Sequence, residues 1–231
     1  MKVVVLQPSY IPWRGYFHQM QKADVFVLYD CVQYDADGWR NRNQIKTAQG
    51  PLWLTIPVRA KGHTSGGTAI KDVPIDPAKP WRQKHWRTIE QSYAKAPHFK
   101  QHAEWLRAFY DRTDTLLADF TCDLTVAIAR ELGIAHTRFV RSGTMPLQGA
   151  KTDRLLSLLT QLGATHYLSG PSARRYLDEG KFAAAGITLE YMQYDYPSYP
   201  QLHGPFAPNV SILDLLFNTG PDAPRYIWAQ P

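Results

Sequence analysis

The sequence predicts an α/β protein with a parallel or mixed sheet, and three observations support that fold class. Short, β-branched apolar runs typical of buried strands recur along the chain, beginning with Val3–Leu6 and Val25–Tyr29. Segments with a helical repeat of apolar residues separate these runs, as in β-α-β units. The chain has 231 residues, of which 44% are hydrophobic, which is enough for one α/β domain. We therefore expect a single domain over residues 1–231, with a helical insert or subdomain at residues 80–133.

The N-terminal stretch, residues 2–46, has the features of a ligand-binding unit. Its first strand stops at Gln7-Pro8, because proline donates no backbone hydrogen bond to a sheet. A turn rich in proline and glycine follows, then an amphipathic helix at 16–22 and a second strand that ends at Asp30. Ligands bind at the carboxyl ends of the strands in open parallel sheets. We therefore expect this unit to form the floor of a site.

The rest of the chain continues the alternation of strands and helices. Residues 31–50 are polar and contain glycine, so we expect a loop there, and the glycine-rich connector 59–67 could cover a ligand. The remaining predicted elements are a strand at 51–58, helices at 80–96, 100–111 and 114–132, a strand at 137–140, a helix at 151–162, a strand at 165–168, a helix at 173–178 capped by Ser172, a strand at 188–194 and a helix at 212–217 capped by Ser211.

The composition limits the classes of function. The net charge of +6 comes from scattered basic residues rather than from a dense stripe, so we do not expect binding to nucleic acid. A cleft for a small substrate, anionic or sugar-linked, fits this charge better. The two cysteines, Cys31 and Cys122, do not suggest a disulfide framework, and no residue spacing indicates a metal site.

Two further compositional features concern location and surface. No apolar run approaches the roughly 20 residues of a membrane span, and no signal sequence is visible, so we expect a cytoplasmic protein. The 13 Tyr, 9 Phe and 7 Trp fit either a bulky core or an aromatic-walled pocket. This surplus of aromatic residues also leaves room for a homodimer.

Polar residues near the predicted strand ends are the candidates for chemistry. His85 and Asp30 are the candidate acid–base groups, because histidine titrates near neutral pH and Asp30 ends a strand. The structural alternatives are a hydrogen-bonded histidine on a helix face and a carboxylate that caps a strand end. Side chains and turns suited to anions or rings are Tyr10, Trp13, Arg40, Arg42, Asn43, Lys46, Ser169 and Gly170.

Several blocks of the sequence resemble the WbqC-like proteins. They are QPSYIPWRGYF at 7–17, ADVFVLYDCVQY at 23–34, WRNRNQIK at 39–46, WLTIPV at 53–58, WRQKHWRTIEQSYAKAPHF at 81–99, YLSG at 167–170, Tyr199 with Gln201, and SILDLLFNTG at 211–220. The resemblance implies a bacterial protein of O-antigen or similar surface-glycan synthesis, for which a glycine transferase activity is proposed. Within these blocks, Gln7, Gly15, Gln201 and Ser211 become candidate substrate-binding residues.

The N-terminal unit also resembles the adenylyltransferase-type, HUP-like Rossmann-like fold, in which a strand leads into P-x-x-x-x-H-x-G-H and a helix. Trp13-Arg-Gly-Tyr16 stands at the position of H-x-G-H, and Ser211 before a helix is similar to the phosphate-binding second signature of that group. Trp13 and Tyr16 replace both histidines. The resemblance therefore implies the fold and argues against nucleotidyl transfer.

We expect a transferase that moves an acyl or aminoacyl group, glycine being implied by the resemblance, onto a sugar. His85 or Asp30 would take the proton from the attacking group, and ATP or an activated acyl donor would be the co-substrate. Two alternatives stay open. One is an ATP-dependent amide ligase of adenylyltransferase-like fold, and the other is a non-catalytic nucleotide-sugar-binding protein.

Overall fold

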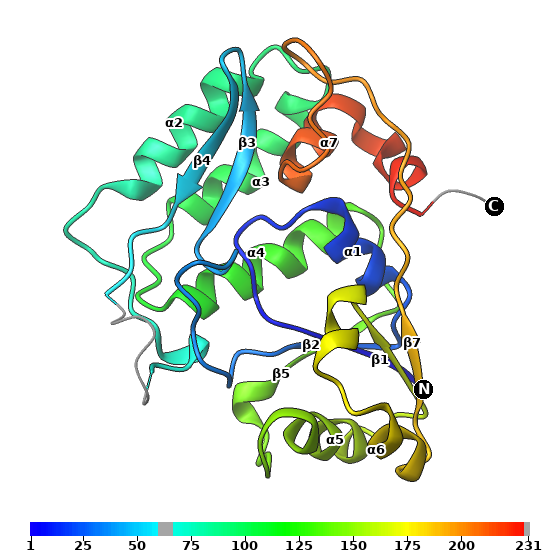
Figure 1. Cartoon of the computed structure of the whole chain (residues 1–231). Helices are drawn as coiled ribbons and strands as arrows, with labels where there is room; N and C mark the ends of the chain where they lie inside the picture. Colours follow the sequence, from blue (N-terminus) through cyan, green and yellow to red (C-terminus); the bar gives the residue numbers. More distant parts are fainter. Residues whose placement is uncertain (60–66, 229–231) are drawn as a thin grey trace.

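Five parallel strands form one sheet in the computed structural model, which describes residues 1–59 and 67–228 (Figure 1). The strands are β1 (Lys2–Leu6), β2 (Val25–Leu28), β5 (Arg138–Arg141), β6 (His166–Ser169) and β7 (Thr188–Tyr191), in the order β5-β2-β1-β6-β7. Val4 of the central strand pairs with Phe26 of β2 on one side and Leu168 of β6 on the other. This sheet confirms the predicted α/β class and is consistent with a Rossmann-like fold.

The strand order creates a switch point beside β1. From β1 the chain proceeds outward through β2 to β5, and it then returns so that β6 and β7 lie on the opposite side of β1. In open α/β sheets such a reversal leaves a crevice at the carboxyl ends of the strands. Here the crevice falls where β1 ends at Leu6 and β6 ends at Ser169.

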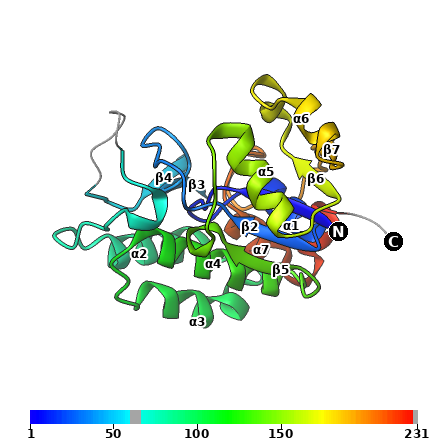
Figure 2. The same ribbon diagram turned by 90° about the horizontal axis from the view of Figure 1, so that it is seen from below.

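Helices cover both faces of the sheet (Figure 1, Figure 2). The helices against the sheet are α1 (Arg14–Gln21), α4 (Leu117–Glu131), α5 (Lys151–Gln161) and α6 (Glu179–Ala184). Val3 and Val5 of β1 pack in a cluster with leucines of α5 and with Phe182 of α6. Val4 belongs instead to the larger core cluster, with residues of α1 and α4. Because successive strand residues point to opposite faces, the apolar residues of β1 pack against the helices on both faces of the sheet.

A layer of further helices extends the larger core. The helices α2 (Trp81–Tyr93), α3 (Phe99–Tyr110) and α4 follow one another, and α3 packs against α7 (Ile212–Thr219), whose residues are all buried. Gly133 follows the C-cap residue of α4, Leu132, and has a φ of +79°, a conformation that suits glycine at a helix end. These elements confirm the helices predicted in this region and near the C-terminus. The status of residues 80–133 as an insert stays a prediction.

An antiparallel hairpin, β3 (Arg42–Thr47) and β4 (Gly50–Thr55), forms a second small sheet. The prediction of a loop throughout 31–50 was wrong here, whereas β4 confirms most of the strand predicted at 51–58. The polar side chains of β3 suggested a loop, but Asn43 and Lys46 are buried and bond to other segments of the chain. Tertiary hydrogen bonds thus override the polarity of this strand.

The connection from β6 to β7 also differs from the prediction. A 3₁₀-helix, η3 (Pro171–Arg175), begins directly after Gly170 and has no side-chain cap, so Ser172 does not cap a helix. The following α6 is capped by Asp178, whose side chain accepts a hydrogen bond from the Lys181 N–H. Proline at the first position starts the 3₁₀-helix before Ser172, which explains why the predicted helix at 173–178 is wrong in bounds and cap.

The other short elements are the 3₁₀-helices η1 (Ile70–Asp72), η2 (Ser142–Thr144) and η4 (Gly220–Tyr226). The glycine-rich connector predicted at 59–67 falls almost wholly on residues 60–66, which lie outside the described residues. Within the described ranges, every helix is too short or too polar to cross a membrane.

Candidate functional site

A cavity of about 1340 Å³ opens at the carboxyl ends of β1 and β6. Leu6 and Gln7 line it from the end of β1, and Gly170 lines it from the end of β6. The cavity therefore occupies the crevice at the switch point of the sheet, where ligands of open α/β folds bind. The N-terminal unit, which the sequence predicts to form the floor of a site, contributes Gln7 and Trp13 to the lining, and its role in binding stays a prediction.

The loop that follows β1, residues 7–13, has an unusual backbone at this floor. Ile11 has a φ of +38°, a left-handed conformation that β-branched residues rarely adopt. Asn43 of β3 holds the loop, because its Nδ2 donates hydrogen bonds to the carbonyl oxygens of Tyr10 (3.2 Å) and Ile11 (2.9 Å). Such a conformation persists only where the surroundings fix it, and strained backbone often marks a functional site.

The cavity is electropositive. Arg40, Lys151 and Arg154 line it, and its described lining contains no Asp, Glu, His or Cys. Arg40 Nη1 donates to the carbonyl oxygens of Gln7 (3.0 Å) and Pro8 (3.2 Å), and the nearby Asp35 carboxylate offsets part of its charge. Burial lowers the pKa of the Arg40 guanidinium, yet an arginine keeps its charge at neutral pH. The lining thus favours an anion.

The N-terminus of α5 opens on the same cavity. Ala150, Lys151 and Thr152 line it, and Ala150 at the N-cap has no side-chain oxygen to accept from the first turn. Gly149 and Lys151 both have positive φ, of +77° and +49°, at this sharp turn into the helix. Uncapped N–H groups and the helix dipole favour a negative group at this position.

Aromatic rings form much of the cavity wall. They are Trp13, Tyr16, Tyr29, Trp39, Tyr167, Tyr176 and Tyr194. The Trp13 ring lies edge-on to Tyr194, with 5.0 Å between the ring centroids. A Cβ atom at Gly15 would collide with the Trp13 indole, so glycine allows this ring to fold back over the start of α1. Ring faces and positive charge together suit a ligand with a ring and an anionic group.

The structure gathers part of the predicted site in this cavity. Gln7, Trp13, Arg40, Asn43 and Gly170 line it, and Gly15 positions Trp13. The predicted residues that do not line it are Tyr10, Asp30, Arg42, Lys46, His85, Ser169, Gln201 and Ser211. Their contacts explain where each of them lies.

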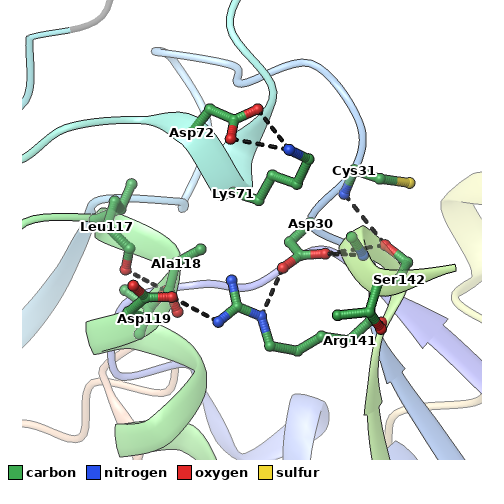
Figure 3. A network of polar contacts seen from close by, with 12 residues as sticks. Asp30, Cys31, Lys71, Asp72, Leu117, Ala118, Asp119, Arg141 and Ser142 are labelled. Atoms are coloured by element: carbon green, nitrogen blue, oxygen red, sulfur yellow. Dashed lines mark hydrogen bonds and ion pairs between the residues drawn. The ribbon is translucent and has the colours of Figure 1, made fainter.

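Asp30 sits in a separate polar network at the ends of β2 and β5 (Figure 3). Its Oδ2 accepts from Arg141 Nε at 2.7 Å, and its Oδ1 accepts from Ser142 Oγ at 3.1 Å and from the Gly143 N–H at 2.6 Å. Arg141 Nη1 also donates to Asp119 Oδ1 at 2.6 Å. The Asp30 carboxylate is fully buried, and its contacts join two strands and α4. Its predicted catalytic role stays a prediction.

His85 lies in the helical layer and is also buried. Its Nδ1 is 2.9 Å from the Tyr10 hydroxyl, which is 2.6 Å from the hydroxyl of Tyr110. Burial lowers the pKa of His85 to about 4, so the imidazole is neutral at neutral pH. Tyr10 is buried in this chain of hydrogen bonds, so it presents no ring face to the cavity.

Lys46 and Gln201 belong to a third buried network. Lys46 Nζ donates to Gln201 Oε1 (2.9 Å) and to the Pro205 carbonyl oxygen (2.7 Å). Gln201 Nε2 donates to the Tyr199 hydroxyl (3.0 Å), which donates to Asp214 Oδ1 (2.9 Å). Burial raises the pKa of the Asp214 carboxyl. The network fastens β3 and the segment before α7 to the α7 helix.

Two other predicted residues hold main-chain segments. The Ser211 hydroxyl caps α7 by accepting from the Leu213 N–H at 3.1 Å, which confirms the predicted cap. Arg42 Nη2 donates to the Asp37 carbonyl oxygen at 2.7 Å. Ser169 is the last residue of β6 and is buried just below the cavity-lining Gly170.

Sequence reasoning missed several residues of the cavity. The main ones are Gln19, Lys151, Arg154, Tyr176 and Tyr194. Gln19 Nε2 donates to the Tyr194 hydroxyl at 2.7 Å, and burial raises the pKa of Tyr194 to about 12. Lys151 could have been found, because it begins the helix that follows a predicted strand of the same sheet. In the described part of the chain, no group of three His, Cys, Asp or Glu side chains could hold a metal ion.

Comparison with known proteins identifies a matching family profile and a similar, uncharacterized protein. The sequence profile described as the WbqC-like protein family matches residues 7–226. The uncharacterized protein Rv1507c of Mycobacterium tuberculosis is 45% identical over 228 residues, which cover 98% of this chain and 97% of that protein. No solved structure matches the chain significantly.

Proposed function

Because this chain belongs to the WbqC-like protein family, we propose that it is a transferase acting on a nucleotide-linked sugar. The group that it transfers is an acyl or aminoacyl group, with glycine as the first candidate. The product would enter a bacterial surface polysaccharide such as O-antigen. In this proposal the cavity at the ends of β1 and β6 is the substrate site.

The observation that supports the proposal most is the charge of the cavity. Arg40, Lys151 and Arg154 line it without any carboxylate among the described lining residues. Such a lining attracts an anion, and the diphosphate of a nucleotide-linked sugar supplies one with two negative groups. We place the diphosphate at the start of α5, where uncapped N–H groups and Lys151 meet the cavity.

The aromatic wall supports a ring beside that diphosphate. The Trp13 ring folds over Gly15 and packs edge-on against Tyr194, and we infer that these contacts fix the ring before a ligand arrives. A preformed wall costs little conformational entropy on binding. We therefore place the base or sugar ring of the ligand against Trp13.

The transfer step follows from the chemistry of the substrates. An amino or hydroxyl group of the sugar attacks the carbonyl carbon of an activated acyl donor. The new bond to the acyl carbon forms, the bond to the leaving group breaks, and the proton of the attacking group passes to a base or to water. The cavity contributes by holding the reactants in contact, which alone lowers a barrier substantially. His85 and Asp30, the bases predicted from the sequence, do not line this cavity, so turnover by His85→Gln and Asp30→Asn variants tests whether either takes part.

Calorimetric titration with UDP-, GDP- and dTDP-linked sugars tests the substrate site. At least one should bind, and the Lys151→Ala/Arg154→Ala double variant should weaken that binding about tenfold or more. Lys100→Ala is the matched control, because Lys100 is an exposed lysine in the first turn of α3, outside the cavity. If no nucleotide-linked sugar binds, the proposal fails. Binding of ATP alone would favour an ATP-dependent amide ligase.

One observation favours a second candidate, a non-catalytic nucleotide-sugar-binding protein. The described lining of the cavity has no His, Asp, Glu or Cys, which are the usual general bases and nucleophiles. Mass spectrometry of a bound nucleotide-sugar incubated with glycyl and acyl donors separates the two candidates. A mass increase by the transferred group supports the transferase, and an unchanged mass with every donor supports the binding protein.

A further inference from the structure

An exposed pair of tryptophans extends the cavity onto the β3–β4 hairpin. Trp39 lines the cavity and is 45% exposed, and Trp53 of β4 is 42% exposed. Their ring centroids are 5.2 Å apart, with 32° between the ring planes. Two adjacent indoles that remain this exposed keep apolar area in water, and a ligand that packs on them would remove that area from water.

Polar groups surround this pair of rings and hold it in place. The Arg42 guanidinium lies 5.0 Å from the centroid of the Trp53 ring, and its Nη2 is tied to the Asp37 carbonyl oxygen. Gln44 pairs with Trp53 across the hairpin and also lines the cavity. The indoles thus form a fixed apolar surface with hydrogen-bonding side chains at its border.

We propose that the Trp39–Trp53 pair is a subsite for a neutral sugar ring of the acceptor saccharide. This rests on the proposed function and names the part of the substrate that lies beyond the diphosphate. One face of a hexose presents C–H groups, which pack on the negative face of an indole, while its hydroxyl groups point outward. Arg42 and Gln44 are placed to bond those hydroxyl groups. Since the two indoles touch, the sugar packs on their exposed faces and not between them.

The size of the pair favours a sugar ring over a protein partner. Half-exposed indoles offer roughly 200 Å² together, whereas a standard protein interface takes about 800 Å² from each partner. The neighbouring exposed apolar residue, Leu52, does not enlarge the patch. It points to the other face of the hairpin, where it lines a separate hollow with Thr88 and His203.

A printed array of neutral bacterial and synthetic oligosaccharides tests the subsite without any nucleotide. The wild-type protein should bind at least one saccharide, and Trp39→Ala and Trp53→Ala should each weaken that binding about tenfold. Leu52→Ala, on the same strand but on the opposite face, should bind as the wild type does. Both tryptophans are half exposed, so their removal should leave the fold intact, which circular dichroism checks.

Separate measurements of nucleotide binding and saccharide binding distinguish a failure of this inference from a failure of the proposed function. Free nucleoside diphosphates should bind Trp53→Ala, whose side chain does not line the cavity, as they bind the wild type. Saccharide binding without any nucleotide binding would overturn the proposed function and retain the subsite. Absence of saccharide binding, or saccharide binding unchanged in both variants, would overturn the subsite. A change from dimer to monomer in the tryptophan variants, seen by analytical ultracentrifugation, would also overturn it by assigning the pair to a homodimer interface.

Discussion

Among single residues, Asp30 has both carboxylate oxygens occupied by protein donors. Arg141, Ser142 and Gly143 supply three hydrogen bonds, and the carboxylate is fully buried. The sequence correctly placed Asp30 at a strand end, but it could not show that the next strand of the sheet brings these donors to it. A carboxylate used in this way joins two strands, and breaking such a contact leaves a buried partner unpaired.

We expect Asp30→Asn to lower the free energy of unfolding by about 2 kcal/mol, because the charge that pairs with Arg141 is lost. Asp119→Asn is the matched control. Asp119 pairs with the same arginine, but its side chain is 42% exposed, so its loss should cost less than about 1 kcal/mol. Urea unfolding of the three proteins measures both values. Equal losses would contradict the structural role given to Asp30.

His85 makes the stability of the fold depend on pH. Its pKa is about 4 in the folded protein, against 6.5 for an unperturbed histidine. Between these values the unfolded chain binds a proton that the folded chain does not, so stability falls as the pH decreases. The stability that the neutral His85 contributes is fully present above pH 6.5. It is lost as the pH falls to about 4, and the loss amounts to roughly 3 kcal/mol of unfolding free energy.

Replacement of His85 by glutamine should therefore lower the slope of unfolding free energy against pH, by an amount that corresponds to nearly one bound proton. Urea unfolding between about pH 7.5 and about pH 4 measures the slope. His18, whose pKa burial also lowers to about 4, leaves a remaining slope in the variant. His136→Gln replaces an exposed histidine and is the control. A wild-type slope in His85→Gln would show that the buried imidazole titrates normally.

The secondary-structure elements differ in how well the sequence specifies them. Strands such as β1 and helices such as α4 carry apolar periods that are visible locally, and both were predicted correctly. β3 was missed because its buried side chains are polar. Asn43 and Lys46 are satisfied by the carbonyl oxygens of distant loops, and no local pattern reveals such partners.

The two predicted serine caps, one observed in the structure and one not, can be compared by mutation. Ser211 accepts from the Leu213 N–H at the start of the buried helix α7, so Ser211→Ala should cost about 1 kcal/mol of unfolding free energy. Ser172 is exposed within η3 and caps nothing, so Ser172→Ala should change stability by less than about 0.5 kcal/mol. Thermal or urea unfolding compares them. A larger loss for Ser172→Ala would contradict the observed start of η3.

For the molecule as a whole, the alternation of elements predicted the sheet, but only its strand order locates the cavity. Gln7 and Trp13 of the N-terminal unit were predicted to bind substrate, and both line the cavity, whereas the binding role itself stays a prediction. The start of α5 was not, because Lys151 lies far along the chain and reaches β1 only through the crossover between β5 and β6. Cavities that form at a switch point depend on such distant contacts, which composition and periodicity do not encode.

The charge of the cavity and the neutrality of the tryptophan subsite predict opposite responses to salt. Raising the ionic strength from about 0.1 M to about 1 M shortens the screening length from about 10 Å to about 3 Å. Binding of a nucleoside diphosphate at Arg40, Lys151 and Arg154 should then weaken about tenfold. The gain in affinity that an attached saccharide provides should stay constant, because stacking on Trp39 involves no net charge.

Calorimetry at the two ionic strengths, with the free diphosphate and its saccharide-linked form, measures both quantities in one series. The double variant Lys151→Ala/Arg154→Ala should have a shallower salt dependence than the wild type, since fewer charges remain to be screened. Lys100→Ala should keep the wild-type dependence. If diphosphate binding proved insensitive to salt, the positive lining would not be what attracts the ligand. If the saccharide increment instead fell with salt, a charged group would have to contribute to the subsite, and Arg42 is the nearest candidate.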